Sequence, residues 1–327
     1  MPERARVALV TGATGFIGSH LTEALLSTHW RVRCLVRKSS MLRWVPVDDV
    51  SLINGDVADP GEDLERAVKN VSVVFHLGGL TSATNDSAYI TVNVEGTRNV
   101  VRAMQKVAPD ALIVFCSSLA AAGPSTKKRP LNETDSPSPV SAYGRSKLTA
   151  ERIVEESGLQ HLIVRPPAVY GPRDSDILAA FRLAARGLAL RVAPEGQQLS
   201  LVHVEDLARG LARAVETEGR GLYYMTDGMI HTWESVLENV SRAVGKKTKT
   251  VSIPSFIADS LSRLEVLRAS MFGSKPLLTP DRMIEMSQAS WTCDDTRARL
   301  DIDYESSITL PDGMRSTAEW YRREGWL

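Results

Sequence analysis

The feature that most constrains the fold is a glycine-rich turn near the N-terminus, in the stretch VALVTGATGFIGSHL. An apolar run ends at Thr11, a helical pattern follows, and Gly12, Gly15 and Gly18 lie between them with the spacing G-x-x-G-x-x-G. In such a strand–turn–helix unit the backbone can approach a pyrophosphate, and the helix N-terminus offers free N–H groups and a positive dipole end. The spacing is one residue longer than G-x-G-x-x-G, but the physics is shared. The stretch predicts the first strand of a parallel sheet with a dinucleotide site at its end.

Short apolar runs alternate with helical patterns through the N-terminal half of the chain. Several runs are continuous Val, Leu and Ile, as in strands that are buried on both faces of a parallel sheet. The expected strands cover residues 6–11, 31–36, 50–54, 71–77, 112–117 and 161–164. The expected helices cover residues 15–26, 61–68, 88–106 and 142–157. The alternation predicts an α/β fold, a doubly wound parallel sheet of the Rossmann type with helices on both faces.

The pattern changes after residue 165. The stretch RPPAVYGPRD is typical of a loop, and it is followed by an expected helix (177–186), strand (199–204) and helix (204–216). The remainder is mostly helical in pattern and includes an amphipathic segment over 256–271. We expect residues 1–168 and 197–222 to form the Rossmann domain. Residues 169–196 and 223–327 are expected to form a smaller, interleaved, mostly helical C-terminal substrate lobe.

Composition narrows the class of protein. The chain has 327 residues, 43% of them hydrophobic, and a formal net charge of +0, with no basic stripe that would indicate a nucleic-acid partner. Its N-terminal residues do not have the pattern of a signal peptide and no apolar stretch is long enough to span a membrane, so we expect a cytoplasmic protein without a signal peptide. Cys34 and Cys116 lie in apolar runs, which predicts that these two thiols are buried. The three cysteines, including Cys293, have no metal-ligand spacing, so we expect no metal site.

The end of the second expected strand indicates which dinucleotide binds. An acidic residue there would bind the ribose 2′-OH of NAD, but this chain has Arg37, Lys38, Ser39 and Ser40. A guanidinium and hydroxyls suit a 2′-phosphate, because they can donate charge-assisted hydrogen bonds to it. The sequence therefore favours NADP over NAD.

A tyrosine and a lysine lie four residues apart in the stretch SAYGRSK. On a helix, Tyr143 and Lys147 would share one face and could point into one site. A phenol has an ordinary pKa near ~10 and is a poor base at neutral pH, whereas a nearby ammonium favours the phenolate. The spacing alone is also common by chance, so the interpretation depends on the other motifs.

Taken together, the motifs resemble those of the extended short-chain dehydrogenase/reductase superfamily, and the resemblance covers nearly the whole chain. In chain order they are GATGFIG at 12–18, Asp56-Val57, HLGG at 76–79, NVEGT at 93–97, Ser117-Ser118, Tyr143-x-x-x-Lys147, RPPAVYGP at 165–172 and HVED at 203–206. Several ordered motifs are far more specific than any one of them. The resemblance implies an NAD(P)-dependent enzyme.

The resemblance also implies roles for individual residues. Ser118 would hydrogen-bond the substrate carbonyl, Tyr143 would act as the general acid/base, and Lys147 would hold the nicotinamide ribose and lower the tyrosine pKa. The residues and the resemblance together predict cofactor contacts from Gly12, Thr14, Gly15, Phe16, Ile17, Gly18, Arg37, Lys38, Asp56, Val57, Leu77, Gly78, Tyr143, Lys147, Pro166, Ala168 and Val169.

Shared fold does not choose the reaction. Members that bind sugar nucleotides usually carry an Arg-Asp pair where this chain has Leu199 and Ser200, and often Tyr-Gly where it has Ala122 and Gly123. The sequence looks more like the dihydroflavonol reductase and 3β-hydroxysteroid dehydrogenase branch. The leading hypothesis is an NADP(H)-dependent oxidoreductase that reduces a ketone, or oxidises the alcohol, of a hydrophobic small molecule. A nucleotide-sugar epimerase or dehydratase is the alternative, and a non-catalytic NADP-binding regulator is the second alternative.

Two further expectations concern surfaces. If the chain follows the family, the helices over 88–106 and 142–157 would pair in a homodimer. The C-terminal lobe carries an apolar stripe that either lines a substrate pocket or packs on the core. Its members are Phe256, Ile257, Leu261, Leu264, Leu267, Met271 and Phe272.

Overall fold

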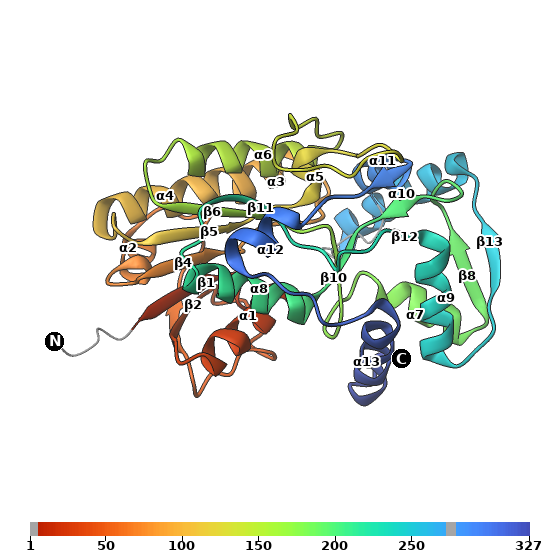
Figure 1. The fold of residues 1–327 in the computed structure, drawn as a ribbon, viewed down its shortest axis with the longest axis horizontal. Coiled ribbons are helices and arrows are strands. Elements are labelled where there is room, and N and C mark those ends of the chain that lie inside the picture. Colours follow the sequence, from red (N-terminus) through yellow and green to blue (C-terminus); the bar gives the residue numbers. More distant parts are fainter. Residues whose placement is uncertain (1–5, 273–278) are drawn as a thin grey trace.

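The protein is built around a seven-stranded, fully parallel sheet (Figure 1). The computed structural model describes residues 6–272 and 279–327, with the backbone alone at 255, 256, 259 and 270–272. In spatial order the strands are β11 (Gly221–Tyr224), β6 (His161–Arg165), β5 (Leu112–Cys116), β4 (Val73–His76), β1 (Val7–Thr11), β2 (Arg31–Val36) and β3 (Ser51–Asn54). The chain order reverses between β1 and β4, which creates a crevice at the carboxyl ends of these strands. The expected Rossmann sheet is confirmed.

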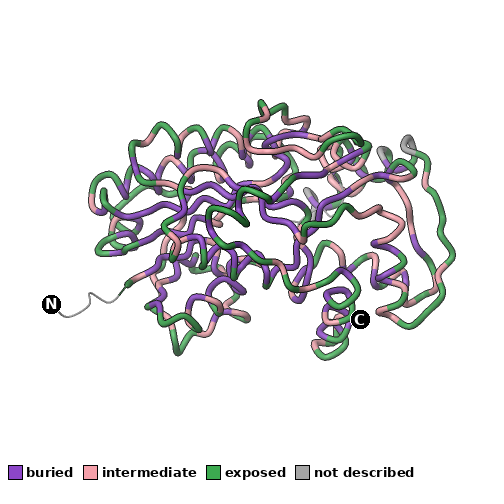
Figure 2. Tube along the Cα trace, viewed as in Figure 1, coloured by how far each residue is buried: buried purple, intermediate pink, exposed green. Residues whose placement is uncertain are grey.

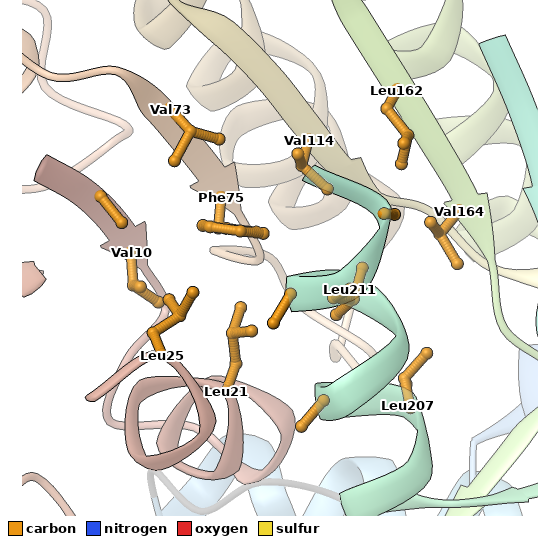
Figure 3. Close-up of a cluster of buried hydrophobic side chains, with 14 of the residues drawn as sticks. Val10, Leu21, Leu25, Val73, Phe75, Val114, Leu162, Val164, Leu207 and Leu211 are labelled. Atoms are coloured by element: carbon orange, nitrogen blue, oxygen red, sulfur yellow. The ribbon is translucent and has the colours of Figure 1, made fainter. Parts of the chain in front are cut away.

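Helices cover both faces of the sheet. Helices α1 (Phe16–Ser27) and α8 (Val204–Glu216) pack on one face, and α2 (Glu62–Val68), α4 (Gly96–Val107) and α6 (Ala142–Glu155) on the other. Successive residues of each strand point to opposite faces of the sheet. Val10 packs with Leu21 and Leu211 in one core (Figure 3), and Leu9 belongs to the core on the other face. The buried chain in Figure 2 follows the sheet and the inner sides of these helices. Burial of the strands on both faces explains their continuous apolar runs.

The helix expected over 88–106 is interrupted by a π-helical turn. It consists of α3 (Asp86–Tyr89), the turn η1 (Ile90–Glu95) and α4. The wider turn contains Asn93, whose amide group hydrogen-bonds both the backbone of Leu80 and the hydroxyl of Ser146 on α6. Such π-turns are frequently found at functional sites. Here the turn ties the loop after β4 to the helix that carries the predicted catalytic pair.

The second lobe contains short strands that the sequence did not indicate. The expected loop after residue 165 contains β7 (Ala168–Tyr170), which pairs in parallel with β10 (Leu201–His203). The strand expected over 199–204 is two strands, β9 (Gln198–Leu199) and β10, because Ser200 bonds the backbone of Cys293 between them. Further short strands are β8 (Leu188–Arg191), β12 (His231–Thr232), β13 (Lys249–Ser252) and β14 (Ser290–Trp291).

The other helices are shorter or belong to the second lobe: α5 (Leu119–Ala122), α7 (Leu178–Ala185), α9 (Trp233–Val244), α10 (Ser255–Phe272), α11 (Pro280–Met286), and finally α12 (Thr296–Ile302) with α13 (Leu310–Arg323). Helices α10 and α11 contact each other and lie along the upper side of the second lobe in Figure 1. The chain then returns to the sheet, since Ala298, Ile302 and Tyr304 belong to the same apolar core as α1 and α8. The lobes are interleaved, and the exact domain boundaries stay a prediction.

Candidate active site

The glycine-rich turn is packed so tightly that side chains would not fit at two of its positions. Gly12 has a φ of +74°, and a Cβ on it would lie 2.8 Å from the backbone of Leu77 and Gly78 after β4. A Cβ on Gly18 would lie 2.1 Å from the Gly12 carbonyl oxygen. These contacts draw the N-terminus of α1 against the ends of β1 and β4. The turn therefore opens onto the crevice where the strand order reverses.

Helix α1 presents its N-terminus to this crevice. The first-turn amides of an α-helix have no partner within the helix, and among the described residues no side chain caps those of α1. The turn Gly12–Gly18 holds Thr14 and the first helical residues Phe16 and Ile17 at this end. A dinucleotide pyrophosphate fits such a place, because the free amides and the positive end of the helix dipole attract its negative charge. The glycines let it approach the backbone closely. The turn therefore leaves backbone amides at the crevice that could hold a pyrophosphate.

The predicted adenosine-binding residues lie at the ends of neighbouring strands. Arg37 and Lys38 are exposed directly after β2, which pairs with β1 beside the glycine turn. Asp56 follows β3 and accepts a hydrogen bond from the Ala58 amide at 3.0 Å, while Val57 is buried. All four residues stand at the same edge of the sheet as the turn. The side chains of Arg37 and Lys38 could reach a 2′-phosphate there.

The end of β4 is fixed by a buried histidine. Both ring nitrogens of His76 are engaged, one with Thr11 at 2.7 Å and the other with Thr97 at 3.0 Å. Thr11 also accepts a hydrogen bond from the Gly78 amide at 3.0 Å, which places Leu77 and Gly78 against the glycine turn. Burial lowers the pKa of His76 to about 3, with the nearby Lys147 charge contributing, so the ring is neutral. His76 therefore positions the crevice and is not free for proton transfer.

Ser118, Tyr143 and Lys147 come together at the carboxyl end of β5. Tyr143 and Lys147 are one turn apart on α6, and Ser118 is the N-cap of α5, where its oxygen accepts a hydrogen bond from the Ala120 amide at 3.1 Å. The buried Lys147 Nζ donates to the Cys116 carbonyl at 2.6 Å and lies 4.3 Å from the centre of the Phe115 ring. The three predicted catalytic residues thus surround one place beside the nucleotide crevice.

Burial sets the protonation of this group. It raises the pKa of Tyr143 above its ordinary value. A hydrogen bond from the Ser118 hydroxyl lowers this pKa in part, and the charge of Glu285 raises it further. Tyr143 as a residue is half-buried. Burial also lowers the pKa of Lys147 to about 8, against the charges of Cys116 and Glu151. At neutral pH the phenol is protonated and the lysine is mostly an ammonium.

A buried ion pair lies one helical turn beyond Lys147, and the sequence analysis missed it. The Glu151 carboxylate accepts hydrogen bonds from Arg165 at 2.9 and 2.6 Å and also from the Ser117 hydroxyl. Arg165 donates further to the hydroxyl of Tyr224 at 3.1 Å. The side chains of Glu151 and Arg165 are 2% and 4% exposed. The i, i+4 spacing from Lys147 to Glu151 and the arginine at the end of β6 were the available signals.

Helix α11 of the second lobe docks on the first turn of α6, which the sequence also did not indicate. The Asp281 carboxylate accepts hydrogen bonds from the amides of Ala142 and Tyr143 at 2.6 and 3.0 Å. The Glu285 carboxylate accepts one from the Ser141 hydroxyl, and burial raises the pKa of Glu285 to about 7. The carboxylate at the helix N-terminus is electrostatically favourable. The second lobe thereby fixes the helix that carries Tyr143.

The remaining predicted cofactor residues lie in the segment after β6. Pro166 is buried and its carbonyl accepts a hydrogen bond from the Leu119 amide at 2.8 Å. Ala168 is exposed and Val169 half-buried, and both belong to β7. The segment therefore runs alongside α5 and Ser118, next to the predicted catalytic group.

The apolar stripe of the second lobe does not pack on the core. Ile257, Leu261, Leu264 and Leu267 are all exposed on α10. The side chains of Phe256, Met271 and Phe272 lie outside the described residues. The structure contradicts core packing for the four residues described, and they are not enclosed in a pocket either.

A separate hollow of about 880 Å³ lies between α1, α8 and α13. Its lining includes Glu23, Arg173 and Arg209, and it shares no residue with the predicted site. Within the described residues no cluster of His, Cys, Asp or Glu could hold a metal ion. No helix in the described part of the chain is both long and apolar enough to cross a bilayer.

Comparison with known proteins decides the family. Residues 8–224 match the NAD dependent epimerase/dehydratase family. The chain belongs to this family. It is 31% identical over 98% of its length to the ceramide reductase of Caulobacter vibrioides, covering 96% of that protein. It is 27% identical to the 4-hydroxy-2-methyl-3-oxo-4-farnesyl-3,4-dihydroquinoline-1-oxide ketoreductase of Stigmatella aurantiaca, over 93% of each chain.

Solved structures of other proteins have the same fold. The UDP-glucose 4-epimerase of Thermus thermophilus, solved in complex with NAD, superposes with a TM-score of 0.79 at 24% identity, covering 97% of this chain and 99% of the other. The chain is therefore an NAD(P)-dependent enzyme of the extended short-chain dehydrogenase/reductase superfamily, as its motifs predict. By its relationship to the reductase and the ketoreductase, it is an oxidoreductase.

Proposed function

We propose that this protein is an NADP(H)-dependent reductase of the ketone of a lipid-like small molecule. The observation that carries the proposal is the convergence of Ser118, Tyr143 and Lys147 beside the nucleotide crevice, with the phenol held protonated by burial. The bound nicotinamide would supply the hydride. The residues of the chain then have to bind the carbonyl oxygen and deliver a proton to it.

Each of the three residues has a separate task in this proposal. Ser118 donates a hydrogen bond to the oxygen on which negative charge develops. Tyr143 gives its proton to that oxygen, which its raised pKa at neutral pH allows. Lys147 holds the nicotinamide ribose and stabilises the phenolate that remains, because its ammonium favours the charged form of a nearby phenol. The lowering of the tyrosine pKa by Lys147 stays a prediction.

The preference for NADP rests on the end of β2. Arg37 and Lys38 are exposed there, and the turn closes with a hydrogen bond from the Ser40 amide to the Arg37 carbonyl at 2.9 Å. No acidic residue stands at this strand end in the sequence to bind a ribose 2′-OH. The T. thermophilus epimerase was solved with NAD, so membership of the family does not by itself predict NADP. The proposal therefore depends on the cations at this strand end.

The substrate class rests on the position that would bind a sugar-nucleotide diphosphate. Leu199 is 8% exposed in the core of the second lobe, and Ser200 is bonded to the Cys293 backbone. Neither residue offers a cation for a diphosphate. The C. vibrioides relative is a ceramide reductase and the S. aurantiaca relative acts on a farnesylated quinoline. We therefore propose a long-chain ketone, such as a ceramide with a ketone in place of a secondary hydroxyl.

The test compares two variants that each lose one phenol hydroxyl. Tyr143→Phe should fold and bind NADPH normally but lose on the order of 10²-fold or more in turnover. Tyr89→Phe is the matched control, because its ring lies 5.9 Å from that of Tyr143 and its hydroxyl bonds only the Ala83 amide among the hydrogen bonds described. NADPH oxidation is measured with a panel of long-chain and aromatic ketones. If Tyr143→Phe keeps more than about a tenth of the rate, Tyr143 is not the proton donor.

The same preparation tests the alternative reaction. UDP-glucose or dTDP-glucose should not raise the melting temperature of the NADP-bound protein, since Leu199 supplies no charge for the diphosphate. A clear shift, together with epimerised or dehydrated product, would replace the ketone reductase with a sugar-nucleotide enzyme. Binding of NADPH without turnover of any ketone or sugar would favour a regulator.

A further inference from the structure

The first three residues of α6 each donate a backbone hydrogen bond to a side chain. Such bonds matter because the N–H groups at the start of an α-helix have no partner within the helix. The Ser141 hydroxyl accepts the bond from the third residue, Gly144, at 2.9 Å. The amides of the first two, Ala142 and Tyr143, donate to the two carboxylate oxygens of Asp281 at 2.6 and 3.0 Å. A residue of the second lobe therefore completes a helix start that the local sequence caps only in part.

This cap acts on one member of the predicted catalytic pair more than on the other. Tyr143 is the second residue of α6, whereas Lys147 lies one turn further into the helix. Helix ends fray, so a first turn without acceptors would hold Tyr143 less firmly than Lys147. Lys147 also has an anchor of its own, because its Nζ donates to the Cys116 carbonyl at 2.6 Å. Asp281 thus holds the residue that would deliver the proton, and not the residue that would hold the ribose.

Helix α11, which carries Asp281, has contacts that do not involve this carboxylate. The Thr279 hydroxyl caps the start of α11 by accepting a hydrogen bond from the Arg282 amide at 3.1 Å. The Trp291 indole N–H donates to the Glu285 carbonyl oxygen, near the other end of the helix, at 2.8 Å. Removal of the Asp281 carboxylate should therefore leave α11 in place and release only the first two amides of α6.

We propose that Asp281 is a positioning residue of the reduction, which fixes the first turn of α6 from the second lobe and so places the Tyr143 phenol for proton transfer. The inference rests on the proposed function, in which Tyr143 is the proton donor. A carboxylate at a helix N-terminus is favourable, because it faces the positive end of the dipole. A displacement of about 1 Å in a reacting group can cost about 10²-fold in rate. Turnover therefore depends on this contact between the lobes as well as on the groups that touch the substrate.

The experiment measures turnover of a ketone and titrates NADPH binding in variants of the full chain. Asp281→Ala removes both acceptors and should lower kcat at least about tenfold, while the Kd for NADPH changes less than about twofold. Asp281→Asn keeps one acceptor oxygen and should give an intermediate kcat. Thr232→Ala is the matched control and should leave kcat unchanged, because Thr232 caps α9 by accepting the Ser235 amide at 3.1 Å. A wild-type kcat in Asp281→Ala overturns the proposal.

A double variant tests whether Asp281 acts through Tyr143. In the Tyr143→Phe background, Asp281→Ala should lower the remaining rate less than about twofold, because the proton donor that it positions is already absent. The same fold-loss in both backgrounds would mean that Asp281 affects the site as a whole and not the placement of the phenol. That result overturns the proposal.

Amide hydrogen exchange gives a measurement that needs no substrate. In Asp281→Ala the amides of Ala142 and Tyr143 should exchange at least about tenfold faster than in the wild type, whereas that of the buried Ala150 should not change. Equal exchange at Ala142 and Tyr143 overturns the proposal. Wild-type turnover by Tyr143→Phe refutes the proposed proton donor and this role with it. Wild-type turnover by Asp281→Ala, with Tyr143→Phe inactive, refutes the positioning role alone.

Discussion

Replacing Glu151 by glutamine should destabilise the protein far more than the same change at the surface. The glutamine keeps the shape of the side chain but removes the negative charge that faces Arg165. In the wild type the carboxylate receives two hydrogen bonds from the guanidinium, at 2.9 and 2.6 Å, and one from Ser117. Because both members of the pair are nearly inaccessible to water, the guanidinium would be left buried without a counter-charge.

The size of the effect follows from this burial. Removing one partner of a buried, hydrogen-bonded ion pair typically costs about 3–5 kcal/mol in the free energy of unfolding. Glu238 and Arg242 form the matched control, an i, i+4 pair on α9 whose side chains are 63% and 64% exposed. Glu238→Gln should cost less than about 0.5 kcal/mol, because water screens that pair. The difference between the two variants therefore measures burial and not the chemistry of the substitution.

The assay is denaturant unfolding of the wild type and both variants, with the free energy of unfolding taken from midpoint and slope. A second change, Arg165→Met in the Glu151→Gln background, removes the orphaned cation. It should recover part of the loss, with a coupling energy of about 1–3 kcal/mol between the two positions. Equal losses for Glu151→Gln and Glu238→Gln, or strictly additive losses at 151 and 165, would refute the reasoning.

Three further perturbations have defined outcomes. Arg37→Ala should lower the difference in binding free energy between NADPH and NADH by about 1–3 kcal/mol, as measured by titration. Equal affinities of the wild type for the two cofactors would contradict the proposed role of Arg37. Gly18→Ala, whose Cβ would meet the Gly12 oxygen at 2.1 Å, should weaken NADPH binding at least about tenfold, whereas Gly61→Ala, with open space around it, should not. Glu285 binds its proton more tightly in the folded protein than in the unfolded chain. The stability that this proton adds to the fold is therefore lost as pH rises from about 4.5 to about 7. The melting temperature of Glu285→Gln should therefore rise relative to the wild type across that range; a constant difference would refute the assignment.

Much of the Rossmann half could be predicted because local rules decide it. The glycine turn, the continuous apolar strands and the end of β5 all carry their information within a few residues. The strand β11 was missed because GLYY is short and only half-buried, and its place at the sheet edge depends on β6. The predicted single strand over 199–204 failed because Ser200 bonds Cys293, more than ninety residues away. Contacts of that range leave no local pattern.

The predicted catalytic group shows the same limit. The face shared by Tyr143 and Lys147 follows from helical spacing, but what holds that helix in place does not. Asp281 caps the first turn of α6 from 138 residues further along the chain than Tyr143. Nothing around Asp281 distinguishes it from any acidic residue near a helix start.

This long-range cap has a consequence for how the site is built. Tyr143, whose phenol would donate the proton, belongs to the Rossmann half. The backbone amides of Ala142 and Tyr143, however, donate their hydrogen bonds to Asp281 of the second lobe. Glu285 on the same short helix also raises the Tyr143 pKa, although less than burial does. Helix α11 therefore affects both the position and the acidity of the phenol. Helix α11 also packs against α10, so a ligand that moves α11 would change the position of the predicted proton donor directly.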